Sequence, residues 1–361
     1  MSRVRHLTAS AVDLALEATV VPSFSRVGYA VRSRLERWEE LTSLPAEGRH
    51  VLVTGANSGL GYATARAVLA AGGKVTGTVR SREKGEQAHA RLARELGGEP
   101  PRDGDAVPRD DTPRDDIAAR LSFEILDLAD LASVRDLADR LLDAERCVDV
   151  VVHNAGAMFA DHEVTSDGLE RTYQVHVVAP FLLTSLLLPR LQRSSASRVV
   201  TVTSGGMYTQ GLDVDRLGSS DGYRGSNAYA HAKRAQVVLT AEWARRVPEV
   251  AFHVVHPGWA LTPGVESSLP TFRRLTGPLL RDPEQGADTI TWLALRPDVP
   301  GAGQLWHDRR PRSAHRLPGT RTGPSDVRRL WDRVAQDAGI APLSPPPDRP
   351  ARPTPPADPQ P

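Results

Sequence analysis

Short apolar runs alternate with longer amphipathic stretches along most of the chain, beginning near His50. Runs such as 51–54 and 198–202 are mostly apolar, and the stretches between the runs repeat apolar residues at helical spacing. Continuous apolar runs of this length are typical of strands buried on both faces of a parallel sheet. The pattern predicts an α/β fold with a doubly wound parallel sheet of about seven strands and helices on both faces. We expect strands at 51–54, 74–79, 121–126, 148–152, 198–202 and 251–255, and helices at 62–71, 83–96, 131–143, 169–192 and 228–246.

Shifts in composition divide the chain into segments. We expect a helical N-terminal extension (1–47), the α/β domain (48–310), a helical C-terminal segment (311–340) and a tail (341–361). Within the domain, 97–120 is rich in Pro, Asp and Arg and is expected to be a disordered surface insertion. Ten of the last 21 residues are proline, which predicts a polyproline-type disordered tail. Before the tail, Ser325 would cap a last helix, which Gly339 would end.

The N-terminal extension has an amphipathic pattern. Val27, Val31, Leu35 and Trp38 recur at helical spacing, with arginines and a glutamate between them. A helix with this pattern either packs on the main domain or lies on a membrane or at a substrate entrance. The mixed charges favour packing, and peripheral membrane contact through this helix is the alternative.

Composition narrows the class of protein. Of 361 residues, 40% are hydrophobic and 25% are charged, with a net charge of +1, so no nucleic-acid partner is indicated. Cys147 is the only cysteine, which excludes an intramolecular disulfide and fits a reducing compartment. Asp13 and Glu17 interrupt any signal-peptide core, and no apolar run reaches 18 residues. We therefore predict a cytoplasmic protein.

A glycine-rich loop follows the first predicted strand and opens a helix, which is the context of a dinucleotide phosphate site. In this loop, Gly55 permits the turn, Gly59 lets the backbone approach a pyrophosphate, and Gly61 lets the helix pack closely. A glycine-rich turn without a ligand is the alternative. The predicted loop contacts are Gly55, Asn57, Ser58, Gly59, Leu60 and Gly61.

Three further strand ends carry candidate cofactor contacts. No carboxylate ends the second strand, where an NAD-binding protein usually has one; Arg80 stands there and fits a 2′-phosphate. We therefore predict NADP(H), with NAD(H) as the alternative cofactor and a solvated arginine as the alternative interpretation. Asp127 and Leu128 follow the third strand and Asn154, Ala155 and Gly156 the fourth, at the edge where open sheets bind ligands.

Tyr229 and Lys233 are four residues apart, so they share one face of the predicted helix. A nearby ammonium favours the phenolate form of tyrosine. Together with the glycine loop, this pair indicates a hydride-transfer enzyme with its own proton donor.

The motifs, taken in order, resemble those of the short-chain dehydrogenase/reductase family over roughly residues 48–310. The resemblance implies a single Rossmann-type domain. Within the family the chain resembles the retinol-dehydrogenase-like branch and, more narrowly, the group called dehydrogenase/reductase SDR family member twelve. The motifs that carry the resemblance are 54–61, Asn154–Gly156, Ser204, Tyr229 with Lys233, and Pro257 with Gly258; segments 167–170, 181–184, 202–207, 255–260 and 284–288 carry the narrower likeness.

The resemblance implies a role for each catalytic residue. Tyr229 would act as the acid and base, Lys233 would lower the pKa of Tyr229 and bind the nicotinamide ribose, and Ser204 would polarise the substrate oxygen. Pro257 and Gly258 would border the nicotinamide and Thr262 would bind its carboxamide. His176 stands where the family has an asparagine whose carbonyl holds a water. His176 would either join that proton relay or be a packed helix residue.

The loops expected near the active site indicate the class of substrate. Apolar residues expected near the site indicate an apolar carbonyl or alcohol, unless half of them pack internally. They are Met158, Phe159, Met207, Tyr208, Trp259, Leu261, Leu269 and Phe272. A cofactor-binding scaffold with little turnover and an NAD-linked sugar epimerase or dehydratase are the other functions considered. No histidine or cysteine spacing indicates a metal site.

The predicted helix that carries Tyr229 has an apolar face, through which two subunits would form a homodimer.

Overall fold

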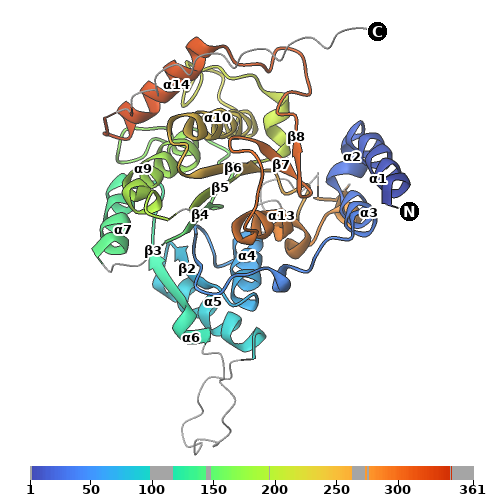
Figure 1. Ribbon diagram of the computed structural model, residues 1–361. Coiled ribbons are helices and arrows are strands. Elements are labelled where there is room, and N and C mark those ends of the chain that lie inside the picture. Colours follow the sequence, from blue (N-terminus) through green and yellow to red (C-terminus); the bar gives the residue numbers. More distant parts are fainter. Residues whose placement is uncertain are drawn as a thin grey trace, which may run out of the picture.

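The computed structural model describes residues 2–97, 117–143, 148–194, 196–261, 273–274, 276–341 and 343 (Figure 1). Within these residues one sheet has eight strands in the order β3-β2-β1-β4-β5-β6-β7-β8. Every neighbouring pair is parallel except β7 and β8. The α/β fold with a parallel sheet is therefore confirmed. The strands are β1 His50–Val53, β2 Lys74–Val79, β3 Leu121–Ile125, β4 Val150–His153, β5 Arg198–Val202, β6 Ala251–Val255, β7 Leu305–His307 and β8 Arg310–Arg312.

Helices cover both faces of the sheet because successive strand residues point to opposite sides. On β1, Leu52 packs into one apolar cluster, whereas Val51 and Val53 pack into the other. One face carries α7 (Leu131–Asp143), α9 (Ala179–Leu191) and α10 (Gly225–Arg246); the other carries α4 (Gly59–Ala70) and α13 (Pro283–Leu295). Beside β2 and β3 lie α5 (Arg82–Glu95) and the short α6 (Ile117–Arg120). Residues 98–116 of the expected insertion and most of the expected tail lie outside the described residues.

The helix expected at 169–192 is interrupted. It consists of α8 (Arg171–Tyr173), a π-helical turn η2 (Gln174–Val178) and α9. Pro180 has no N–H to donate to the carbonyl of His176 four residues earlier, which explains why the regular ladder fails here. The run Arg171–Leu191 is long and apolar enough to cross a membrane, but 78% of its apolar 18-residue window is buried inside the protein, as expected of a core helix.

The last helix, α14 (Pro324–Asp337), packs on the apolar side of α10 and α9. The Trp331 ring centroid lies 4.7 Å from that of Trp243 and 4.8 Å from that of Phe181. The expectation that Ser325 caps this helix is wrong: the N-cap is Gly323, because Pro324 already takes the first helical position.

The N-terminal extension forms three helices, α1 (Ser2–Glu17), α2 (Val20–Phe24) and α3 (Arg26–Glu36), followed by a 3₁₀ turn, η1 (Leu41–Ser43). These helices lie beside the β7–β8 hairpin and α13, at the β8 edge of the sheet (Figure 1). The sheet extends to Arg312, beyond the expected domain end at residue 310.

Candidate active site

Four adjacent parallel strands, β1, β4, β5 and β6, end at one edge of the sheet. The glycine loop follows β1, Asn154 follows β4, Ser204 follows β5 and Pro257 follows β6. The carboxyl edge of an open parallel sheet is where such folds bind ligands. The topology therefore brings most of the predicted site residues to one place.

The glycine loop has the conformation that its glycines permit. Gly55 and Gly59 have φ angles of 69° and 55°, in the left-handed region. A Cβ on Gly61 would lie 2.3 Å from the Gly55 carbonyl oxygen and 2.5 Å from Nδ2 of Asn154, so no larger residue fits. Asn154 Nδ2 donates to the Thr54 carbonyl at 2.9 Å and ties β4 to the loop. The first N–H groups of α4 open onto this loop, which suits a pyrophosphate.

The end of β2 is bonded to the same loop. The N–H of Ala56 donates to the Thr78 carbonyl at 3.1 Å, and the N–H of Gly55 donates to the Thr78 hydroxyl at 3.3 Å. Arg80 follows two residues later with an exposed side chain. A guanidinium at this position is free to move toward an anionic group beside the loop.

Other predicted cofactor contacts have side chains committed elsewhere. Leu128 is 7% exposed and belongs to the core, and Asp127 Oδ1 accepts from the Ala129 N–H at 2.9 Å. Leu60 packs on α13, since a Cβ on Gly286 would lie 2.5 Å from its Cδ2. Contacts of Leu60 and Leu128 with a cofactor would therefore use the backbone. Ser58 and Gly156 are exposed, and Asn57 and Ala155 are half-buried.

Ser204, Tyr229 and Lys233 converge between β5 and α10. The Ser204 side chain lies beside the Tyr229 hydroxyl, and Lys233 Nζ lies 5.4 Å from the centre of the Tyr229 ring. Lys233 is 3% exposed, donates to the Val202 carbonyl at 2.8 Å, and has a pKa lowered to about 7 by burial. Burial raises the pKa of Tyr229, and the adjacent Ser204 side chain offsets part of this rise. Lowering of the Tyr229 pKa by Lys233 stays a prediction.

His176 lies in the π-helical turn with its ring between the fourth strand's loop and Tyr229. The ring centroids of His176 and Tyr229 are 5.2 Å apart, edge to face, and a Cβ on Gly156 would lie 2.4 Å from Cε1 of His176. Nε2 of His176 bonds to the Ala157 carbonyl at 2.8 Å. Burial and the nearby Lys233 charge lower the pKa of His176 to about 3. The buried imidazole is therefore neutral at physiological pH and holds the Gly156–Ala157 loop. This arrangement favours a packed helix residue, and the role of His176 in a proton relay stays a prediction.

A residue that the sequence analysis missed completes this arrangement. Gln236 Nε2 donates to the His176 carbonyl at 2.7 Å and replaces the donor that Pro180 lacks. Gln236 lies three residues after Lys233 on α10, on the same side of the helix. Two signals in the sequence pointed to it: a proline four residues after His176, and an amide in helical register with Tyr229.

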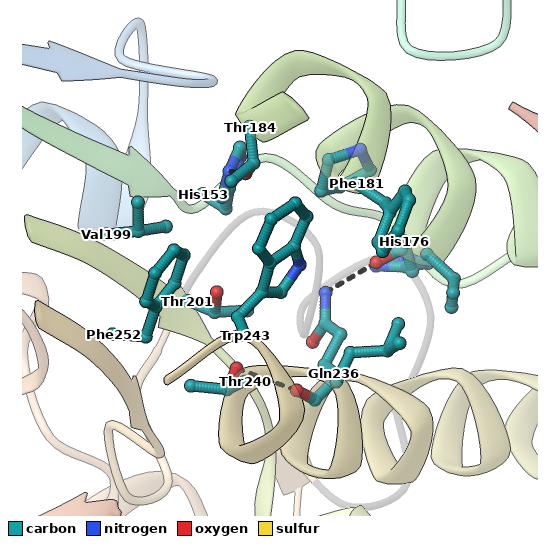
Figure 2. A pocket seen from close by; sticks show the side chains of 13 residues that line it. His153, His176, Phe181, Thr184, Val199, Thr201, Gln236, Thr240, Trp243 and Phe252 are labelled. Atoms are coloured by element: carbon teal, nitrogen blue, oxygen red, sulfur yellow. Dashed lines mark hydrogen bonds between the residues drawn. The ribbon is translucent and has the colours of Figure 1, made fainter. Parts of the chain in front are cut away.

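A small cavity of about 30 Å³ lies behind this turn, between α9, α10 and the sheet (Figure 2). His153, Gln236 and Thr201 are among its lining residues. Gln236 Oε1 and His153 Nδ1 are buried and have no hydrogen-bond partner among the described residues. The volume suits a water molecule, which would satisfy both atoms.

The loop after β6 borders the same site. Gly258 has φ 76°, and its N–H donates to Nδ1 of His256 at 3.1 Å. Thr262, Leu269 and Phe272 lie outside the described residues. Among the apolar candidates, Met207 and Tyr208 are buried in the core, whereas Met158, Phe159, Trp259 and Leu261 are half-buried.

In the part of the chain that the structure describes, no group of three or more His, Cys, Asp or Glu side chains could hold a metal ion. His162 lies near Tyr223 and bonds weakly to the Gly218 carbonyl at 3.4 Å. The glycine loop and the free N–H groups in the first turn of α4 do fit the phosphates of a dinucleotide.

Sequence comparisons agree with this geometry. The family model described as short chain dehydrogenase matches residues 49–116 and 110–271. The chain belongs to this family of oxidoreductases, in its retinol-dehydrogenase-like branch, and is therefore an enzyme that acts on CH–OH or C=O groups. The family expected from the sequence is confirmed.

Two curated relatives show the branch. Dehydrogenase/reductase SDR family member 12 from Bos taurus is 37% identical over 281 residues, which cover 77% of this chain and 82% of the relative. Retinol dehydrogenase 14 from Mus musculus is 36% identical over 306 residues, covering 81% and 86%.

Two solved structures have the same fold. An uncharacterised protein from Mycobacterium paratuberculosis is 28% identical with a TM-score of 0.63, covering 84% of this chain and 98% of its own. A blue fluorescent protein from a metagenomic library, in complex with NADPH, is 25% identical with a TM-score of 0.54, covering 72% and 95%.

Proposed function

We propose that the protein is an NADP(H)-dependent oxidoreductase that transfers hydride between nicotinamide and a carbonyl or alcohol of an apolar substrate. The observation that carries this proposal is the convergence of Ser204, Tyr229 and Lys233 at the strand edge that also holds the glycine loop. The family assignment supports it.

The cofactor supplies or accepts the hydride, and the side chains handle the proton. The raised pKa of Tyr229 keeps its phenol protonated, ready to donate to the developing alkoxide during carbonyl reduction. Ser204, beside Tyr229, would donate a hydrogen bond to the same oxygen. Lys233 would bind the nicotinamide ribose and restore the proton to Tyr229; its pKa of about 7 lets it gain and lose a proton near neutrality.

Arg80 supports the preference for NADP(H). Its guanidinium is exposed, it follows a strand whose end is bonded to the glycine loop, and no carboxylate stands there. A 2′-phosphate accepts two hydrogen bonds from a guanidinium, whereas a ribose hydroxyl favours a carboxylate. NAD(H) is the alternative cofactor.

Half-buried apolar side chains support an apolar substrate. Met158, Phe159, Trp259 and Leu261 lie in the loops after β4 and β6. Such a surface excludes a charged sugar because each charge would lose its hydration without a partner. Turnover of charged short substrates in preference to long apolar ones would contradict the proposal of an apolar substrate.

The test is NADPH oxidation by the full-length chain, followed by absorbance, with a panel of apolar ketones and aldehydes. We expect turnover in the wild type and a loss of about 10²- to 10⁴-fold in Tyr229→Phe, which keeps the ring but removes the proton donor. Tyr223→Phe serves as the matched control, because Tyr223 bonds to Thr172 and Glu170, away from Ser204. NADPH binding without turnover in the wild type would favour a cofactor-binding scaffold instead.

We further propose that the protein is cytoplasmic and that its N-terminal helices contact an anionic membrane surface. Their exposed apolar residues are Leu14, Val20, Val21, Val27 and Leu35, and Arg26, Arg34 and Arg37 are exposed on or next to α3. Apolar and basic groups together favour anionic lipid. Sedimentation with phosphatidylserine vesicles, lost in Val20→Asp/Val21→Asp, would support this; equal sedimentation of both forms would oppose it.

A homodimer through α10 remains a prediction. The apolar side of α10 that suggested it packs on α14 through Trp243 and Trp331, so a dimer would need another surface of this helix. Light scattering on the purified chain determines the oligomeric state.

A further inference from the structure

Phe24, at the end of α2, packs among aromatic residues of the active-site loops. Its side chain is 3% exposed. Its ring centroid lies 4.4 Å from that of His256, 5.3 Å from His307 and 6.0 Å from Trp259, each in an edge-to-face arrangement. The N-terminal segment is thus part of the structure around the site.

Phe24 contacts the loop that carries Ser204. A Cβ on Gly205, the next residue, would lie 3.1 Å from Cε2 of Phe24, so the ring packs directly on that backbone. The ring also stacks near Tyr208, with centroids 6.1 Å apart. Since interiors are close-packed, a change in the size of residue 24 reaches the backbone next to Ser204.

Phe24 also contacts the loop after β6. Its carbonyl accepts from the Trp259 N–H at 2.7 Å, and a Cβ on Gly258 would lie 2.7 Å from the same carbonyl oxygen. One residue therefore contacts both loops that flank the expected position of the reacting carbon.

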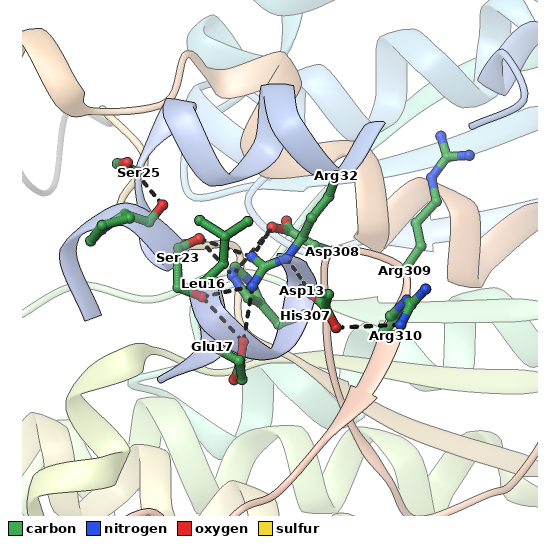
Figure 3. A network of polar contacts seen from close by, with 12 residues as sticks. Asp13, Leu16, Glu17, Ser23, Ser25, Arg32, His307, Asp308, Arg309 and Arg310 are labelled. Carbon is green, nitrogen blue, oxygen red and sulfur yellow. Dashed lines mark hydrogen bonds and ion pairs between the residues drawn. The ribbon is translucent and has the colours of Figure 1, made fainter. Parts of the chain in front are cut away.

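A buried charge network that includes Arg32 and Asp308 lies beside Ser23 and Ser25, the neighbours of Phe24 in the chain (Figure 3). Arg281 donates to the carbonyls of Ser23 at 3.1 Å and Ser25 at 3.2 Å, on either side of Phe24. Asp308 binds Arg281 at 2.6 Å and Arg32 at 2.7 Å, and the three side chains are each 1% exposed. Charges this buried are stable only when paired, so the network tolerates little displacement.

We propose that Phe24 is a positioning residue of the active site, which holds Ser204 and the Pro257–Gly258 loop in the relative position that hydride transfer requires. This inference rests on the proposed function. Phe24 acts through Gly205 and Trp259, and the N-terminal helices are then a component of the catalytic domain.

The experiment measures kcat, KM and thermal stability for the full chain with Phe24→Ala and Phe24→Leu. Leu44→Ala is the control, because Leu44 is 4% exposed in the apolar cluster under α4 and its truncation costs stability of a similar order. We expect Phe24→Ala to lose about tenfold or more in kcat, since small displacements of reacting groups are costly. Phe24→Leu would recover part of kcat, and Leu44→Ala would keep wild-type kcat at a lower melting temperature.

Two results separate this inference from the function on which it rests. Wild-type kcat in Phe24→Ala, with the wild type active and Tyr229→Phe inactive, overturns the positioning role alone. Absence of wild-type turnover overturns the proposed function instead. If Phe24→Ala does not fold, Phe24→Leu decides: a kcat equal to that of the wild type rejects the proposal.

Discussion

The side-chain amide of Gln236 donates to the backbone carbonyl of His176 at 2.7 Å, where Pro180 provides no N–H. Gln236→Leu removes this donor and leaves a buried carbonyl unsatisfied. We expect the free energy of unfolding to fall by about 1–3 kcal/mol. Denaturant titration measures it, with Gln192→Leu at the exposed end of α9 as the control. Equal stability of the two variants would show that the bond contributes little.

Replacement of His176 by asparagine is expected to leave the dependence of kcat/KM on pH unchanged. Its pKa of about 3 keeps the ring neutral across the working range, so His176→Asn removes no titrating group. The measurement is kcat/KM against pH from about 5.5 to 9. A shifted acid limb in the variant would mean that His176 titrates during turnover.

Arg80→Ala is expected to raise the dissociation constant for NADPH and leave that for NADH unchanged. Loss of a charge-assisted hydrogen bond of about 1.5–3 kcal/mol corresponds to roughly 10- to 150-fold. Arg82→Ala, two residues along and also exposed, is the control. Fluorescence titration with both cofactors gives the constants, and equal wild-type affinity for NADH and NADPH would reject the preference.

Acid is expected to destabilise the fold from about pH 6.5 downward. Burial lowers the pKa to about 4 in His153 and His253 and to about 3 in His176 and His307. The unfolded chain takes up these protons near pH 6.5, whereas the folded chain does not. The stability from these groups is therefore full above pH 6.5 and is lost as pH falls toward the folded pKa values.

Thermal unfolding across this range tests the effect. The melting temperature should decline between about pH 6.5 and 4.5, and the decline should be smaller in His153→Gln, which keeps a hydrogen-bonding group for Thr184. A melting temperature constant over this interval would contradict the expectation.

The sequence predicted the central strands because they are buried on both faces, which leaves an uninterrupted apolar run. It did not predict α13, whose buried face includes Asp288, 5% exposed and paired with Arg309 at 2.7 Å. All residues from 286 to 295 are buried, polar ones included, so apolar residues do not mark one face of that helix. The strands β7 and β8 have three residues each, too short for a pattern.

The parts of the candidate site that were predicted from the sequence are those whose residues lie close together along the chain. The glycine loop and the Tyr229–Lys233 pair are readable because their spacing alone defines the geometry. The roles of Gln236 and Phe24 depend on partners 60 and 235 residues away, at His176 and Trp259, which only the fold brings together. The pKa of His176 likewise depends on burial, a property of the packed structure.

The link between Arg32 and Asp308 also has a consequence for the order of folding. Arg32 leaves the ribosome early, soon after its partners Asp13 and Glu17, but its third carboxylate partner, in the β7–β8 turn, is synthesised 276 residues later. Until then, the first three helices lack this buried partner, and a contact of this sequence separation forms slowly. Complete docking of the first helices is therefore a late event of folding.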